Sequence, residues 1–135
     1  MARSRNIKPG FFVNEDLGNI HPLGRLLFIG LWTIADFKGD LEWRPKRIKA
    51  QLLPYDNCDI QELANNLEQY GFIRYYYCTG TTYIHIYNFD IHQNPHINEK
   101  RNGSQIPEFN ESLTLAIDIK QFAIKTEQVP ILSEP

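Results

Sequence analysis

The sequence lacks several features that would assign it to a common functional class. It has two cysteines, Cys58 and Cys78, in 135 residues, which are too few for a disulfide framework and lack Cys-x-x-Cys spacing. No apolar run approaches the roughly 18 residues that a membrane-spanning helix requires. Lys8-Pro9-Gly10 interrupts the stretch where a secretory signal would be apolar. We therefore expect reduced thiols in a cytoplasmic protein without membrane contact.

A strong basic charge is also missing. The chain has 14 Lys and Arg against 16 Asp and Glu, a net charge of −2, whereas nucleic-acid-binding domains are often strongly basic. The charge is unevenly distributed: residues 1–101 hold 12 basic and 11 acidic side chains, and residues 102–135 hold 2 and 5. The acidity lies in the C-terminal part, so the main body remains compatible with nucleic-acid binding.

Motifs for catalysis are absent from the sequence. It has no phosphate-binding glycine loop, no nucleophile elbow and no paired acids with a plausible base. His92 and His96 could join His85 or a cysteine in a zinc site, but the spacing fits no standard pattern and Pro95 keeps them off a common helix face. We expect a protein that is not an enzyme and has no cofactor and no metal.

Helix signals dominate the first half of the chain. Asn14, followed by two acids, predicts a short helix that ends near Gly18. Pro22 opens a helix in which apolar residues up to Ile34 recur at three- and four-residue steps and fill most of the circumference, which predicts a central, buried helix. Two further helices are predicted, over Pro45–Leu53 and from the capping residue Asp59 to about Tyr70.

Strand signals follow the last of these helices. Residues 72–78 and 82–89 are rich in Tyr, Ile, Phe and Thr, and the short link Thr79-Gly80-Thr81 predicts a hairpin. Three helices and a hairpin are the order of a winged helix, a helix-turn-helix whose hairpin forms the wing. We predict an α+β winged-helix domain over residues 1–100 and an acidic C-terminal extension over 101–135. Alternation within residues 112–124 favours an added strand, followed by a frayed end.

Distinctive sequence motifs are spread along most of the stretch from residue 7 to about residue 100. They are Ile7–Phe12, Asn14-Glu15, Pro22–Thr33, Arg44–Ala50, Pro54–Asp56, Gly71–Arg74, Tyr83-Ile84, Asn88-Phe89 and His92–His96. On these strings the chain resembles the N-terminal domain of phage and prophage replication proteins of the replisome-organiser type. The resemblance implies a winged-helix fold and a role in origin binding or helicase recruitment. Wing tips in that family are often charged, whereas Cys78–Thr82 holds no Lys or Arg.

Candidate DNA contacts lie on the second and third predicted helices. The second carries four basic side chains: Arg44, Lys46, Arg47 and Lys49. Such side chains neutralise backbone phosphates, and this helix often touches the DNA backbone in helix-turn-helix proteins; a solvated helix face is the alternative. The third offers amide side chains, without Lys or Arg: Gln61, Asn65, Asn66 and Gln69. Amides can pair bidentately with adenine, but they are also ordinary surface residues.

The predicted hairpin is rich in tyrosine. Its expected partner contacts are Tyr75, Tyr77, Tyr83 and Tyr87. Tyrosine suits protein interfaces because it buries a large area and keeps a polar tip. Core packing and stacking on single-stranded bases are the alternative roles.

Two functions follow from these features. The first is a phage-type DNA-binding or replication module, with DNA and a host or phage replication protein as partners. The alternative is a winged-helix protein-interaction module, such as a small phage-encoded inhibitor of a host DNA-handling or defence complex. The basic cluster and the family resemblance favour the first, and the near-neutral charge and uncharged wing tip favour the second. The sequence leaves a homodimer open.

Overall fold

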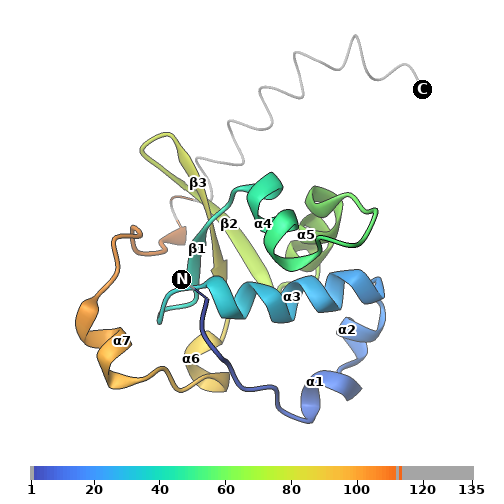
Figure 1. Ribbon diagram of the computed structural model, residues 1–135, viewed down its shortest axis with the longest axis horizontal. Coiled ribbons are helices and arrows are strands. Elements are labelled where there is room, and N and C mark those ends of the chain that lie inside the picture. Colours follow the sequence, from blue (N-terminus) through green and yellow to red (C-terminus); the bar gives the residue numbers. More distant parts are fainter. Residues whose placement is uncertain (1, 112, 114–135) are drawn as a thin grey trace.

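The computed structural model describes residues 2–111 and 113. Its elements are, in chain order, α1 (Gly10–Val13), α2 (Glu15–Gly18), α3 (Pro22–Ile34), β1 (Asp40–Glu42), α4 (Pro45–Leu52), α5 (Ile60–Gln69), β2 (Ile73–Cys78), β3 (Thr81–Ile86), α6 (Phe89–His92) and α7 (Ile97–Asn102). The predicted α+β class is confirmed. The helices and the small antiparallel sheet are arranged in a way that is compatible with a winged helix (Figure 1).

Helix α3 lies at the centre of the molecule, with α4 on one side and α1 and α6 on the other (Figure 1). Leu27 and Leu31 are fully buried, and Trp32 is nearly so. A Cβ atom on Gly30 would lie 2.9 Å from Cδ1 of Leu52, so the glycine lets α4 approach closely. The predicted central, buried helix is confirmed.

The other predicted helices are confirmed with small shifts at their ends. Asn14 caps α2 by accepting a hydrogen bond from Leu17 N at 3.0 Å. Asp59 caps α5 by accepting from the N–H groups of Gln61 and Glu62 at 3.0 and 3.2 Å. Helix α4 ends at Leu52, one residue before the predicted end. The apolar side of α5 is buried, as its periodicity predicts: Ile60, Leu63, Ala64 and Leu67.

The sheet has three antiparallel strands in the order β1-β3-β2. The predicted hairpin is confirmed, with its turn at Thr79 and Gly80, which both have positive φ. Strand β3 ends at Ile86, before the predicted Phe89, because Asn88 adopts a left-handed conformation that leads into α6. Strand β1 was not predicted, since three residues carry too short a pattern.

The sheet has an apolar face toward the helices and an aromatic face covered by residues 104–111. Tyr76 OH donates to the carbonyl oxygen of Pro107 at 2.8 Å, and Lys38 Nζ donates to that of Ile106 at 3.3 Å. Phe109 stacks on His85, with ring centroids 4.3 Å apart. The packed part of the chain thus continues beyond residue 101, where the extension was predicted to begin. The predicted strand within 112–124 lies outside the described residues, apart from the partly buried Leu113.

The N-terminal segment is fixed against the end of α3 by a buried ion pair. The guanidinium of Arg5 meets the carboxylate of Glu99 in two hydrogen bonds of 3.1 and 2.9 Å, and both side chains are about 5% exposed. Arg5 also donates to the carbonyl oxygens of Trp32 and Ala35 at 2.9 and 3.0 Å. One guanidinium therefore joins the N-terminus, the C-terminal end of α3 and α7.

Removing the guanidinium should destabilise the whole fold. We expect Arg5→Ala to lower the free energy of unfolding by about 3 kcal/mol, because it leaves the buried carboxylate of Glu99 with only the more exposed Arg3 nearby. Arg3→Ala is the matched control: Arg3 lies 3.4 Å from the same carboxylate but is 42% exposed, and its loss should cost less than about 1 kcal/mol. Urea denaturation at neutral pH measures both values.

The effect of Arg5 should depend on pH in a defined direction. Its hydrogen bonds hold the pKa of Glu99 below the ordinary value of 4.5. The stabilisation is therefore complete above pH 4.5 and is lost as the pH falls through the lowered pKa. The difference in unfolding free energy between the wild type and Arg5→Ala should shrink on acidification. A difference that stays constant between neutral and strongly acidic pH would contradict the ion pair.

Candidate nucleic-acid interface

Helix α4 places the predicted basic cluster on the surface. Pro45 occupies the first turn, and Ile48 is buried against the core. Lys46 and Arg47 are exposed and, within the described part of the chain, form no ion pair and no side-chain hydrogen bond. Among the four basic residues of the cluster, these two can therefore bind an anion from solution without first giving up a partner in the described part of the chain.

The other two basic residues already have partners. Arg44 Nε lies 3.0 Å from Oε2 of Glu42, and both side chains are about half exposed. Lys49 Nζ donates to the carbonyl oxygen of Leu53 at 3.3 Å, beyond the C-terminal end of α4. Because exposed ion pairs are weak, Arg44 remains able to exchange Glu42 for another anion.

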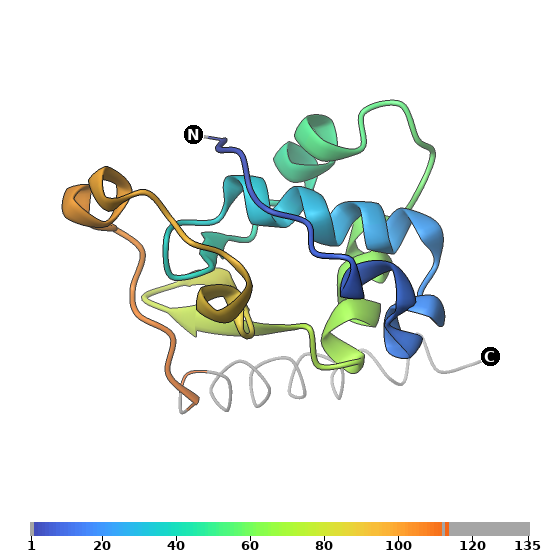
Figure 2. The same cartoon turned by 90° about the horizontal axis from the view of Figure 1, so that it is seen from below.

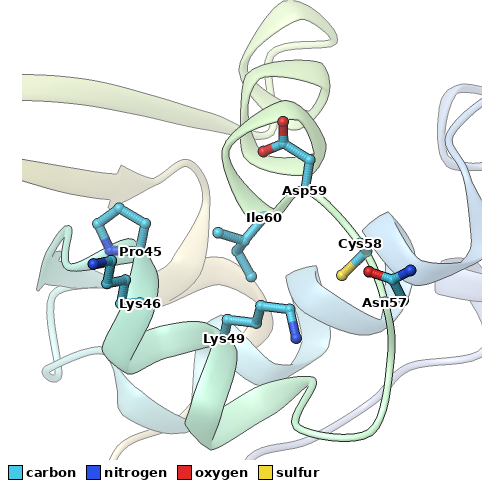
Figure 3. Close-up of a pocket in the computed structure, with 7 residues that line it drawn as sticks. All are labelled: Pro45, Lys46, Lys49, Asn57, Cys58, Asp59 and Ile60. Carbon is cyan, nitrogen blue, oxygen red and sulfur yellow. The ribbon is translucent and has the colours of Figure 1, made fainter.

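An open groove of about 630 Å³ runs between α4 and the start of α5 (Figure 3). Its lining residues are Pro45, Lys46, Lys49, Asn57, Cys58, Asp59 and Ile60. Lys46 and Lys49 supply its positive charge from α4, and Asp59 supplies a negative one from the cap of α5. Since Asp59 already occupies the N–H groups of the first turn of α5, an anion in the groove would depend on the two lysines.

Gln61 is part of a hydrogen-bond network between α5 and the sheet. Its Oε1 accepts from Trp43 Nε1 at 3.0 Å, and its Nε2 donates to Tyr75 OH and to Asn65 Oδ1, both at 2.9 Å. Tyr75 OH donates to Asn65 Oδ1 at 2.9 Å. Both amide hydrogens of Gln61 are therefore in use. Pairing with adenine needs one free donor and one free acceptor, which Gln61 could offer only by breaking this network.

The remaining predicted amides differ in their surroundings. Asn65 is exposed, and its oxygen belongs to the network. Asn66 is half-buried, and its Oδ1 has no hydrogen-bond partner among the described residues. Gln69, at the end of α5, is exposed. Gln61, Asn65 and Gln69 thus follow one another at four-residue steps along the exposed part of α5, but Gln61 and Asn65 are hydrogen-bonded within the protein. The exposed part of α5 also carries the acid Glu62.

The structure divides the predicted tyrosine contacts between the two faces of the sheet. Tyr75 is 7% exposed and packs edge-on against Trp43, with centroids 5.9 Å apart. Burial, together with the negative charge of Glu68, raises the pKa of Tyr75. Tyr77 is partly buried against the core. These two tyrosines contribute to packing on the face that the helices cover.

Tyr83 and Tyr87 lie on the opposite face, beside residues 104–111. Tyr83 stacks on the buried Tyr76, with centroids 5.3 Å apart. Tyr87 OH donates to Glu111 Oε2 at 3.2 Å, and burial and Glu111 raise the pKa of Tyr87. The predicted partner surface is therefore already contacted by the chain itself.

Sequence reasoning missed the polar pair beneath Phe109. Asp40, which is 1% exposed, forms a hydrogen bond with Nδ1 of His85. Burial raises the pKa of Asp40, although the hydrogen bond with His85 opposes the rise. Only the pairing of β1 with β3 brings the two side chains together. No local signal in the sequence would have found this pair.

Only the described residues can be searched for a metal site. Among them, no three His, Cys, Asp or Glu side chains are grouped to hold an ion. Cys58 and Cys78 are free thiols. Within the same residues, no helix is long and apolar enough to cross a membrane.

We compared the chain with known protein families, curated proteins and solved structures. No protein-family model, no curated protein and no solved structure matches the chain.

The network around Gln61 makes a testable contribution to stability. We expect Gln61→Ala to lower the free energy of unfolding by about 1–2 kcal/mol, because it leaves the buried Trp43 Nε1 and Tyr75 OH without this partner. Gln69→Ala, a change of the same residue type on the same helix, should alter it by less than about 0.5 kcal/mol. Equal effects of the two substitutions in urea denaturation would show that the network does not stabilise the fold.

Proposed function

We propose that the chain is a winged-helix module that binds duplex DNA through its phosphate backbone, as part of a phage-type replication system. In a winged helix, α4 and α5 correspond to the helix-turn-helix and the β2–β3 hairpin to the wing. The observation that carries the proposal is the exposure of Lys46 and Arg47 on α4, which have no ion-pair partner among residues 2–111 and 113. In helix-turn-helix proteins, the helix before the recognition helix crosses the DNA backbone.

The groove beside α4 supports the same assignment. Lys46 and Lys49 line it next to the first turn of α5, and Arg44 lies one residue before α4. A phosphate at this position would meet several cations, and their neutralisation of the DNA charge releases counterions. The resemblance to phage replication proteins covers α4 as the string Arg44–Ala50 and supports a role at an origin or in helicase recruitment.

Replacing the two exposed cations of α4 with acids should weaken binding to DNA. For a duplex of about 20 base pairs at about 50 mM salt, we expect Lys46→Glu/Arg47→Glu to raise the Kd at least about tenfold and to reduce the slope of log K against log salt by about 2. Fluorescence anisotropy titrations at several salt concentrations measure both quantities.

The control makes the same change of charge elsewhere. Lys100 and Arg101 are also adjacent and exposed, in the last turn of α7, so Lys100→Glu/Arg101→Glu matches the net charge of the α4 variant. The proposal requires a much smaller effect from this control. It is refuted if the native chain does not bind at about 50 mM salt, where phosphate-driven affinity is strong.

Binding should depend little on DNA sequence. Gln61 is held in its network, and α5 carries no Lys or Arg to contact guanine. We therefore expect Kd values for duplexes of equal length and different sequence to agree within about threefold, since phosphate contacts carry no sequence information. A duplex selected from a random pool that binds about a hundredfold more tightly would show direct base reading.

A protein-interaction role is the second candidate, because α1 and α6 carry exposed apolar side chains. Phe12 and Val13 on α1 are 73% and 79% exposed, and Ile91 on α6 is 65% exposed. Such residues favour a protein contact. If a replicative helicase is the partner, Phe12→Ser/Val13→Ser should weaken its binding in calorimetry and Lys46→Glu should not. If Lys46→Glu weakened helicase binding and Phe12→Ser/Val13→Ser did not, the apolar residues of α1 would be excluded as the helicase contact.

A further inference from the structure

A cavity of about 450 Å³ lies on the side of α3 away from α4. It is bounded by the N-terminal segment, α3 and the turn from β3 into α6, which lie near one another in Figure 2. The DNA interface proposed above uses none of its residues. Cavities of this size, mostly apolar with a few polar groups, are the usual form of sites for small ligands.

Aromatic rings form much of the wall. Phe11 and Phe28 both pack edge-on against Trp32, with centroid distances to Trp32 of 5.7 and 5.2 Å and interplanar angles of 80° and 72°. Phe72 and Phe89 complete the apolar lining. Rings held at such angles present edges and faces to a further ring, which favours a planar aromatic group over a flexible chain.

The polar lining is biased toward anions. Within the part of the chain that the structure describes, no Asp or Glu lines the cavity, although the chain carries a net charge of −2. Lys8 and His92 do line it, together with the amide side chains of Asn6 and Asn88. Lys8 Nζ is exposed and makes a long hydrogen bond of 3.3 Å to the carbonyl oxygen of Ile91. It can therefore turn to a stronger acceptor.

We propose that this cavity binds an aromatic carboxylate, with its ring against Phe28 and Trp32 and its carboxylate at Lys8. One lysine with neighbouring amides matches the single charge of a carboxylate, since a charge-assisted hydrogen bond from an ammonium group suits a carboxylate oxygen. The same chemistry is offered by a free aromatic acid and by a phenylalanine next to an acidic residue in a peptide. The proposal does not depend on DNA binding.

Trp32 provides the probe for a direct test. In a Trp43→Phe background it is the sole tryptophan, since the chain has two, so a single indole N–H signal in NMR spectra reports on the cavity. Titration with phenylacetate should shift this signal saturably. Phenylacetamide, which has the same ring without the charge, should bind about fivefold more weakly, as expected for a partly solvent-exposed ion pair.

Substitution of Lys8 separates charge recognition from general binding. Lys8→Gln should abolish the preference for phenylacetate over phenylacetamide, whereas Lys46→Gln, the control on α4, should retain it. Lys8 is exposed, so Lys8→Gln should keep the native circular dichroism spectrum. The absence of a saturable shift at Trp32, or a preference that survives Lys8→Gln, overturns the proposal.

A peptide distinguishes the two sources of the ligand. An acetylated, amidated Asp-Phe peptide should shift the same Trp32 signal. Tighter binding than phenylacetate assigns the cavity to a protein segment, and weaker binding assigns it to a free acid. Shifts with the peptide that do not compete with phenylacetate contradict a single site.

Discussion

Helix α3 presents apolar side chains around most of its circumference, so other elements must cover most of its surface. Leu27 and Leu31 are fully buried, and α5 and the N-terminal segment each cover part of the helix. Gly30 admits α4 on a further side. This requirement fixes where the remaining elements lie, and it separates two surfaces: the basic helix α4 on one side of α3 and the aromatic cavity on the other.

The polar contacts hold this arrangement at its two ends. Arg5 and Glu99 join the N-terminus to α7 across the C-terminal end of α3. Gln61 joins α5 to Trp43 and to the sheet. The second contact also affects the proposed function, because a glutamine that is hydrogen-bonded to Trp43 and Tyr75 can pair with a base only by breaking those bonds. The proposed mode of DNA binding, through phosphates from α4, follows from that internal use of Gln61.

Local patterns predicted the longer elements, but they predicted neither β1 nor the short helices α1, α6 and α7, and they did not predict the contacts between elements. Helix α5 was predictable because Asp59 caps it and its apolar residues repeat at helical spacing, and the hairpin because Gly80 marks its turn. Strand β1 has only three residues, and its pairing depends on β3. The basic residues on α4 could be identified from sequence, but the partners of Gln61 come from distant positions. The cavity was not predictable, since its walls belong to segments from residue 6 to residue 93.

The central claim is that α4 and the adjoining start of α5 form the surface that meets DNA. NMR mapping of backbone amide signals during titration with a short duplex at low salt tests it most directly. The account predicts that the largest changes fall on residues 44–50 and 57–60, and that the signals of α1 and α6 change little. Changes concentrated on the β2–β3 hairpin or around α1 and α6, with α4 unaffected, would contradict it.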